Sequence, residues 1–244
     1  MIRAGSALLA VLASSGVALG AGAHSKDDPM HEPMIFWGAG AEVDGTDAGW
    51  LSDNDGTLVT WDAYGWVGGD DVKVRFEAEG ESHDGDVEES ELRGFVSWNI
   101  AEFWDFQAGA RYDFEPEGLW WAAAGFHGMA TYFFETDALV FVSENGDAQL
   151  RLEQSIDFAV TQDLFLEPHV EVNAFAEDVP ELGVGAGVSD VEIGLQLRYE
   201  FSRKFAPYLD LVYERAVGET AGIARAAGDD VEQTTLRIGL RVRL

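Results

Sequence analysis

Apolar and polar side chains alternate along the last stretch of the chain, residues 230–244. Five apolar residues occupy every second position from Leu236 to Leu244, and three arginines lie between them. A period of two is typical of a β-strand with an apolar face and a polar face. In a membrane barrel, a terminal strand of this kind pairs with the first strand, so that no unpaired edge is left in lipid.

The same alternation recurs through most of the chain. It predicts about twelve strands, each long enough to cross a membrane when tilted. The predicted strands span residues 35–43, 57–67, 71–81, 87–98, 103–113, 119–129, 134–143, 148–160, 164–176, 189–200, 205–216 and 231–244.

The lengths of the connections between these strands help to decide between two possible folds. Alternation alone fits a soluble barrel or sandwich, whose apolar faces turn inward, and an outer-membrane barrel, whose apolar faces meet lipid. The connections alternate in length: 44–56, 82–86, 114–118, 144–147, 177–188 and 217–230 include every long one, and 68–70, 99–102, 130–133, 161–163 and 202–204 are short. Long outer loops and short periplasmic turns are typical of outer-membrane barrels. We therefore predict an all-β, antiparallel barrel of about 12 strands in the bacterial outer membrane.

Aromatic residues near the predicted strand ends support this fold. Aromatic girdles at the two membrane interfaces are typical of such barrels, whereas core packing in a soluble protein is the alternative. The predicted girdle residues are Phe36, Trp37, Trp61, Trp66, Trp98, Phe103, Trp104, Trp120, Trp121, Tyr132, Phe133 and Phe134.

The first 34 residues predict export. Arg3 precedes an apolar run over 7–19, and small residues at 21–23 surround a cleavage point. This pattern indicates a signal peptide over 1–23, because the run is short for a membrane anchor. Residues 24–34 are polar with two prolines, so we expect a flexible periplasmic tail before a barrel domain over 35–244.

Charge narrows the range of partners. The chain has 45 acidic and 15 basic residues, a formal net charge of -30. Nucleic acid is therefore excluded as a partner, whereas cations are favoured. The chain has no cysteine, which removes thiolate metal sites and thiol catalysis.

Four long runs of the chain are distinctive: WDAYGWVGGDDVKVRFEAEGE, VEESELRGFVSWNIAEFWDFQAGARYDFEPEG, GVGAGVSDVEIGLQLRYEFSRKFAPYLDLVYER and GETAGIARAAGDDVEQTT. They resemble the outer-membrane copper resistance protein B family, and the resemblance spans about 57–244. It implies an outer-membrane β-barrel that helps bacteria handle excess copper, together with periplasmic copper-binding proteins. Family members carry a longer methionine- and histidine-rich stretch before the barrel, which is reduced here to a few residues.

Those few residues are candidate copper ligands. Met30, His31 and Met34 offer two thioethers and an imidazole within one short segment, and His24 lies upstream. Thioethers favour Cu(I), whereas imidazole accepts either oxidation state. The alternative is a linker that binds no metal.

Four further candidates lie on predicted strands. His127 and Met129 are two positions apart, as are His169 and Glu171, so each pair shares one face of its strand. All four are candidates to line the lumen as a path for copper ions, and ordinary hydrogen-bonded lumen groups are the alternative.

The remaining lumen charges predict interlocking salt bridges that fill a narrow barrel. The acidic set is Glu77, Glu79, Glu89, Glu91, Glu153, Asp157, Glu192 and Glu200, and the basic set is Arg75, Arg93, Arg111, Arg151, Arg198, Arg237, Arg241 and Arg243.

The prediction is therefore an outer-membrane protein that binds copper and sequesters or transports it. A general cation-selective channel is the alternative. We expect no enzyme: a rim hydrolase would depend on His83 with Asp84 and Asp86, in a short acidic loop without a nucleophile pattern.

Overall fold

The computed structural model describes residues 35–47 and 56–244, which form thirteen strands in one antiparallel sheet. The signal peptide predicted over 1–23 and the tail predicted over 24–34 lie outside the described residues. The strands are β1 (Phe36–Asp47), β2 (Thr57–Gly68), β3 (Val72–His83), β4 (Asp86–Ala101), β5 (Trp104–Glu115), β6 (Leu119–Met129), β7 (Glu135–Ser143), β8 (Ala148–Ser155), β9 (Phe158–Ala159), β10 (Leu164–Phe175), β11 (Gly187–Tyr199), β12 (Phe205–Ala216) and β13 (Glu232–Arg243).

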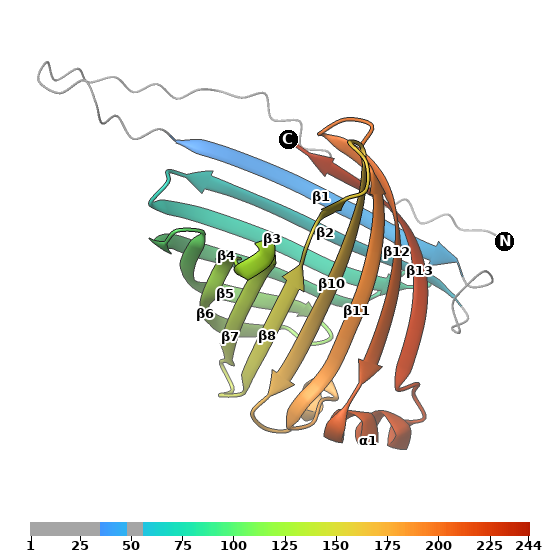
Figure 1. Cartoon of the computed structure of the whole chain (residues 1–244). Helices are drawn as coiled ribbons and strands as arrows, with labels where there is room; N and C mark the ends of the chain where they lie inside the picture. Colours follow the sequence, from blue (N-terminus) through green and yellow to red (C-terminus); the bar gives the residue numbers. More distant parts are fainter. Residues whose placement is uncertain (1–34, 48–55) are drawn as a thin grey trace, which may run out of the picture. The chain divides into compact units, whose positions relative to one another are not determined.

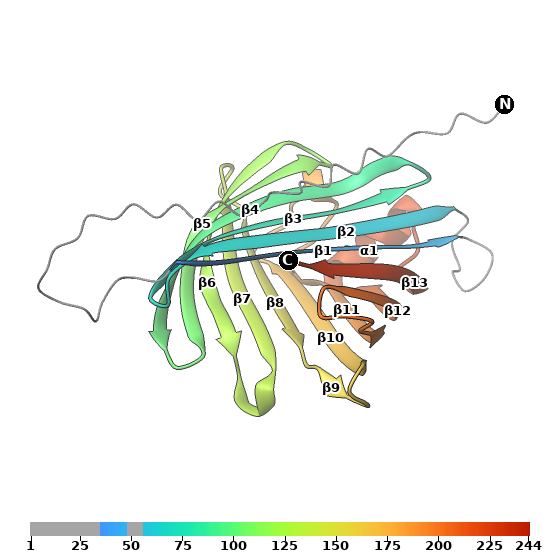
Figure 2. The same cartoon turned by 90° about the horizontal axis from the view of Figure 1, so that it is seen from above.

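The sheet closes on itself. Each strand pairs with the next one along the chain, except that β8 and β9 both pair with β10. β13 pairs with β1 through a register that joins Gly40 to Arg243 and Gly45 to Ile238. β9 has two residues and pairs with β10 beyond the end of β8, so β8 and β9 together occupy one position in the barrel. The result is the predicted closed barrel of twelve strands, with β13 beside β1 (Figures 1 and 2).

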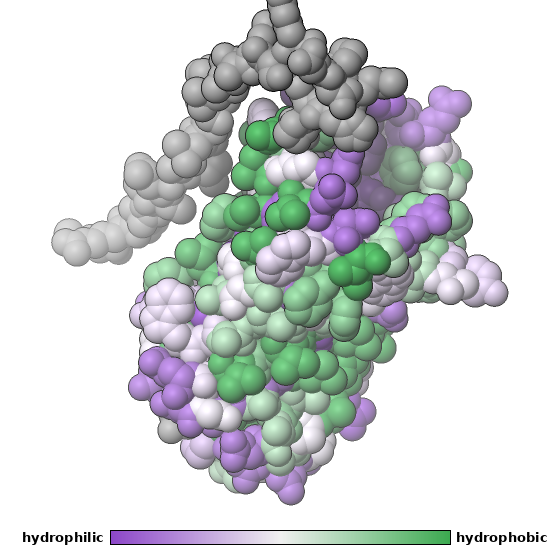
Figure 3. Space-filling model, turned by 90° about the vertical axis from the view of Figure 1, so that its left-hand side faces the viewer, coloured by the Kyte–Doolittle hydropathy of each residue, from purple (hydrophilic) through white to green (hydrophobic). Residues whose placement is uncertain are grey.

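The two faces of the sheet follow the alternation in the sequence. On β11, Ile193, Leu195 and Leu197 are exposed on the outside of the barrel, whereas Gln196 and Arg198 are buried in the lumen. Figure 3 shows hydrophobic side chains gathered over one outer face of the barrel, with hydrophilic groups toward its ends. This inversion of the usual soluble pattern is what an outer-membrane barrel requires.

The two ends of the barrel differ as the connection lengths predict. The end that carries the longer connections is called here the loop end, and the opposite end the turn end. The loop end holds the short helix η2 (Pro180–Leu182) and the helix α1 (Gly218–Ala227), whereas the turn end holds η1 (Thr131–Phe133). The sequence predicted only a loop over 217–230, so α1 is an addition to the prediction. Of the helices in the described part of the chain, none has the length and hydrophobicity needed to cross a membrane.

The aromatic residues divide between the two faces. Trp37, Trp98 and Trp120 are exposed on the outside near strand ends, as predicted for a girdle. Trp121 is only 1% exposed and points into the lumen, so its assignment to the girdle was wrong. The reason is the period of two: Trp120 and Trp121 are consecutive in β6, so only one of them faces lipid.

The lumen contains an apolar cluster beside its charges. Trp121 packs there with residues of β4, β6 and β7 and with the connection between β10 and β11. The buried members are Phe95, Leu119, Trp121, Ala123, Leu139, Phe141, Phe175 and Val179, and Leu182 and Val184 pack against them. The β10–β11 connection therefore folds into the loop end of the barrel.

Candidate functional site

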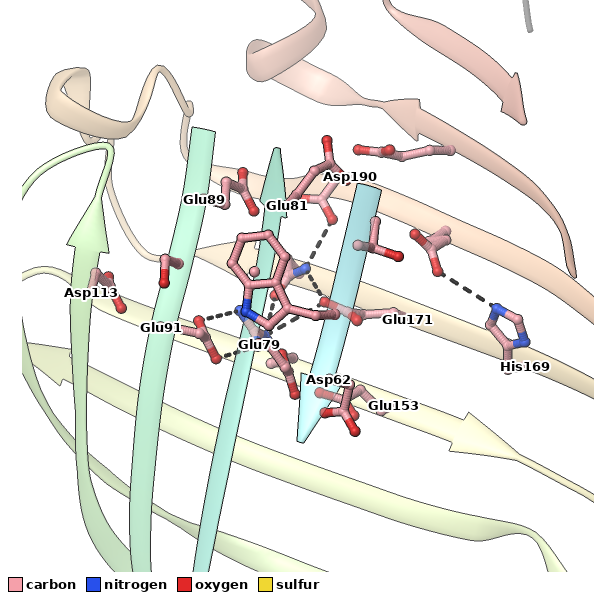
Figure 4. A pocket seen from close by; sticks show the side chains of 18 of the residues that line it. Asp62, Glu79, Glu81, Glu89, Glu91, Asp113, Glu153, His169, Glu171 and Asp190 are labelled. Carbon is pink, nitrogen blue, oxygen red and sulfur yellow. Dashed lines mark hydrogen bonds and ion pairs between the residues drawn. The ribbon is translucent and has the colours of Figure 1, made fainter. Parts of the chain in front are cut away.

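Two cavities occupy the lumen. The loop-side cavity measures about 680 Å³ and opens toward the β10–β11 connection and α1. The turn-side cavity measures about 720 Å³ and lies toward the β6–β7 and β8–β9 connections. Eight residues line both cavities and form the neck between them: Glu42, Asp62, Glu79, Glu153, Glu167, His169, Glu171 and Glu192. Figure 4 shows several of these side chains converging from strands on different sides of the barrel.

The lining is strongly acidic. Among the described residues, sixteen carboxylate side chains and three arginines line the loop-side cavity. The turn-side cavity is lined by eleven carboxylates and four arginines of the described chain. Carboxylates of one sign in a confined space attract cations and repel anions.

Ion pairs join the strands at the turn end. Arg198 on β11 is fully buried, and its Nη2 donates to both carboxylate oxygens of Asp157 at 2.9 and 2.8 Å. Arg198 also pairs with Glu167 on β10, and Nη1 of Arg241 lies 3.2 Å from the same carboxylate. Arg241 in turn pairs with Glu42 on β1. These contacts tie β10 and β11 to the closing pair of strands, β13 and β1.

A second network crosses the middle of the lumen. Nε of Arg93 on β4 lies 3.3 Å from Glu77 and 3.2 Å from Glu91. Nη1 of Arg151 on β8 lies 3.0 Å from Oε1 of Glu91, which is 60 positions away in sequence. The predicted interlocking of acidic and basic side chains is confirmed for these residues. Buried charges of this kind stay paired because loss of one partner strands the other.

Arg111 marks the boundary between the charged and apolar parts of the lumen. Its guanidinium carbon lies 4.5 Å from the ring centres of both Trp121 and Phe141. Its Nε lies 2.8 Å from Asp113, whose other oxygen accepts a hydrogen bond from the Trp121 indole at 2.7 Å. Stacking and ion pairing together fix this side chain against β6 and β7.

His169 is one of two candidate ligands that the structure places at the neck. Its Nε2 lies 3.6 Å from Oε1 of Glu192 on β11 and 3.8 Å from Oδ2 of Asp210 on β12. Its ring rests over Gly194, the residue opposite it on β11, where an added Cβ would lie 2.0 Å from Nε2. His169 therefore needs a glycine opposite it to occupy this position.

Of the other three barrel candidates, one shares the neck with His169 and two lie away from it. Glu171 lines the neck, but its carboxylate lies 3.5 Å from Arg151 and accepts a hydrogen bond from Asn173 at 2.7 Å. His127 points inward from β6, and its Nδ1 lies 2.8 Å from Asp137 on β7. Met129 borders the turn-side cavity. The structure thus keeps the pair His127 and Met129 apart from the neck.

The four tail candidates, His24, Met30, His31 and Met34, lie outside the described residues. Within the described ranges, no three or more histidine, aspartate or glutamate side chains form a ready-made metal site. The candidate site is therefore a path lined with donors. It includes Asp210 and Gly194, which sequence reasoning missed, although the register of the β10–β11 hairpin pairs Gly194 with His169.

Comparisons with known proteins agree with this architecture. The family described as "Copper resistance protein B precursor (CopB)" matches residues 46–244. A copper resistance protein B homolog of Pseudomonas syringae pv. tomato is 39% identical over 194 residues, and copper resistance protein B of Escherichia coli is 36% identical over 194 residues. Each alignment covers 79% of this chain and 66% of the relative, so the chain spans just under two thirds of their length.

The fold is also found in a solved structure. The NanC porin superimposes with a TM-score of 0.57 over 84% of this chain and 100% of the porin, at 12% sequence identity. This similarity concerns the fold, which is that of an outer-membrane barrel, and agrees with localisation in the outer membrane.

Proposed function

The chain belongs to the copper resistance protein B family, and from this premise we propose that it contributes to copper resistance by binding copper ions in the lumen of an outer-membrane barrel. Copper is the cargo, and outer-membrane lipid surrounds the barrel. The family and the fold favour a non-enzymatic protein.

The neck is the observation that carries this proposal. Seven carboxylates and His169 line both cavities, so an ion that passes from one cavity to the other meets all of these groups. Carboxylate oxygens and imidazole nitrogens are both copper ligands. The excess of acid at the loop end draws cations toward the neck.

The tail supplies a second proposed site. His24, Met30, His31 and Met34 offer softer ligands, which would capture copper in the periplasm before or after it reaches the barrel. His127, Met129 and Glu171 are proposed as further contacts along the lumen. Periplasmic copper-binding proteins are the proposed partners that exchange copper with the tail.

A copper series tests the proposal. A strain that lacks the protein is complemented with the full chain, with a tail variant in which His24, Met30, His31 and Met34 are replaced by alanine, or with His169→Gln. We expect the deletion to lower copper tolerance, the full chain to restore it, and His169→Gln to restore it only in part.

Other outcomes redirect the proposal. Full restoration by His169→Gln and loss of tolerance in the tail variant would move copper binding to the tail. A deletion strain with normal tolerance would reject the copper function. Steady conductance of alkali cations by the purified barrel in a planar bilayer, unchanged by copper, would then support the general cation channel.

A further inference from the structure

We propose that the neck takes copper as Cu(II), held between the imidazole of His169 and the carboxylates of Glu192 and Asp210. The proposal rests on the proposed copper-binding function and adds the ligands and the oxidation state. The proposal states that the lumen site binds Cu(II) in preference to Cu(I).

The three donors come from consecutive strands. His169 on β10, Glu192 on β11 and Asp210 on β12 all point into the lumen, and the imidazole Nε2 lies 3.6 and 3.8 Å from the two carboxylates. Ligands bound at about 2 Å from a metal ion lie about 3 Å from one another. Small rotations of these side chains would close the set around an ion, whereas their present spacing is wider than that of a metal site among the described residues.

Asp210 gives an independent indication of a ligand. Its side chain is 8% exposed, and its Oδ1 is buried without a hydrogen-bond partner among the described residues. Its other oxygen, Oδ2, lies 3.8 Å from the imidazole Nε2, and Arg237 is the residue opposite Asp210 on β13. A buried carboxylate oxygen without a partner is destabilising, and natural proteins rarely retain one. Since Asp210 lines the loop-side cavity, a cation that arrives there would supply the missing partner.

The backbone holds the imidazole in place. Gly194 is paired with His169 across the β10–β11 hairpin, and any side chain there would collide with the ring. The ring is therefore seated against β11, with Nε2 directed at Glu192 and Asp210.

The chemistry of the donors selects the oxidation state. One imidazole nitrogen with carboxylate oxygens is a donor set that suits Cu(II), whereas Cu(I) prefers thioether or thiolate sulfur. Among the described residues that line either cavity, the only sulfur is that of Met129, which borders the turn-side cavity and is 39% exposed. The lumen thus contrasts with the methionines of the tail, Met30 and Met34.

Electron paramagnetic resonance of the purified full chain tests the site. The four tail ligands are replaced by alanine, so that they do not contribute, and one equivalent of Cu(II) is added in detergent. We expect a copper signal with nitrogen coupling from one imidazole. The variants His169→Gln and Asp210→Asn should bind Cu(II) at least about ten-fold more weakly, and His169→Gln should also lose the nitrogen coupling of this site.

A control variant and a measurement with Cu(I) complete the experiment. His83→Gln removes an imidazole that lines neither cavity, so its signal and affinity should match those of the parent. Under reducing conditions, a Cu(I) chelator should remove all copper from the tail-free chain. Circular dichroism confirms that each variant keeps its β structure.

Three outcomes would overturn the proposal: an unchanged signal in His169→Gln, a loss of signal in His127→Gln instead, or Cu(I) that the tail-free chain retains against the chelator. These outcomes are separate from the growth assay. Normal copper tolerance of the deletion strain would reject the copper function and leave a Cu(II)-binding neck. Impaired tolerance with an unchanged His169→Gln signal would keep the function and reject this site.

Discussion

The two cavities of the lumen are built by the same twelve strands, yet their charges are organised differently. At the turn end, eleven carboxylates of the described chain face four arginines, and Arg198 and Arg241 share Glu167 and have further acidic partners. At the loop end, sixteen carboxylates of the described chain face three arginines, and Asp210 has a buried oxygen with no hydrogen bond. Both ends therefore contain ion pairs and an excess of negative charge, and the excess is larger at the loop end.

This difference shows that a polar lumen face can serve two purposes. Paired charges hold strands together, because arginines such as Arg93 and Arg241 bind carboxylates from two or three strands. Unpaired carboxylates repel one another and lower stability, but they attract cations to the lumen. Substitutions at single lumen and loop-end residues test each side of this contrast.

Replacing Arg198 tests whether the turn end is held by ion pairs. Arg198→Met leaves Asp157, Glu167 and Glu200 without their shared partner, so we expect the free energy of unfolding to fall by about 3–5 kcal/mol. Urea unfolding of the barrel in lipid vesicles, followed by tryptophan fluorescence, measures the change.

The matched control is an exposed ion pair at the loop end. Arg215 and Glu232 lie 3.7 Å apart with half or more of each side chain exposed. Arg215→Met should cost less than about 1 kcal/mol, because water screens exposed pairs. Equal losses in the two variants would contradict the role assigned to the buried arginine.

Replacing Trp121 tests how much the apolar cluster in the lumen contributes to the stability of the barrel. Trp121→Ala removes a buried ring that stacks on Arg111 and donates to Asp113, so we expect a loss of about 3–4 kcal/mol. Trp120→Ala, one residue away on the lipid face, is the control and should cost clearly less. A larger loss at Trp120 would mean that the two faces of β6 are reversed.

Helix α1 tests how much the loop-end connections contribute. Gly222 lies within this helix, and a Cβ added there would meet no atom within 4 Å. Gly222→Ala should stabilise the helix by about 0.5–1 kcal/mol. Amide hydrogen exchange over 218–227 should slow, and faster exchange would show that the glycine is needed for packing.

Glu89 tests the repulsion at the loop end. Its carboxylate lines the loop-side cavity together with Glu81 and Glu91. Glu89→Gln removes one like charge and should raise the free energy of unfolding by on the order of 0.5 kcal/mol at low salt, less at high salt. Glu117→Gln, in the exposed β5–β6 connection, is the control. A loss of stability in Glu89→Gln would contradict an excess of unpaired charge.

The strands and their faces were predictable because a period of two is visible in the sequence. Trp121 escaped this reasoning, since its position near a strand end suggested a girdle although its neighbour Trp120 already occupied the lipid face. Helix α1 also escaped, because Gly218 and Gly222 lower helix propensity and Val217 supplies no side-chain cap.

The sequence predicts that acidic and basic side chains pair in the lumen, but it does not predict which residues pair with which. Arg241 and Glu167 are 74 positions apart, and Arg151 and Glu91 are 60 apart, so their contacts depend on how the closed barrel brings distant strands face to face. The partners of His169 lie on the two following strands, where hairpin register decides which side chains meet. Alternation identifies the face but gives no register across the lumen.

The apolar cluster around Phe141 and Phe175 has an electrostatic consequence. Its side chains form a wall of low polarisability beside the carboxylates of the loop-side cavity. Such a wall does not screen charge, so field lines from the carboxylates are concentrated in the aqueous part of the lumen. A cation entering at the loop end is therefore attracted more strongly to the carboxylates of the loop-side cavity than it would be in a lumen without the apolar cluster.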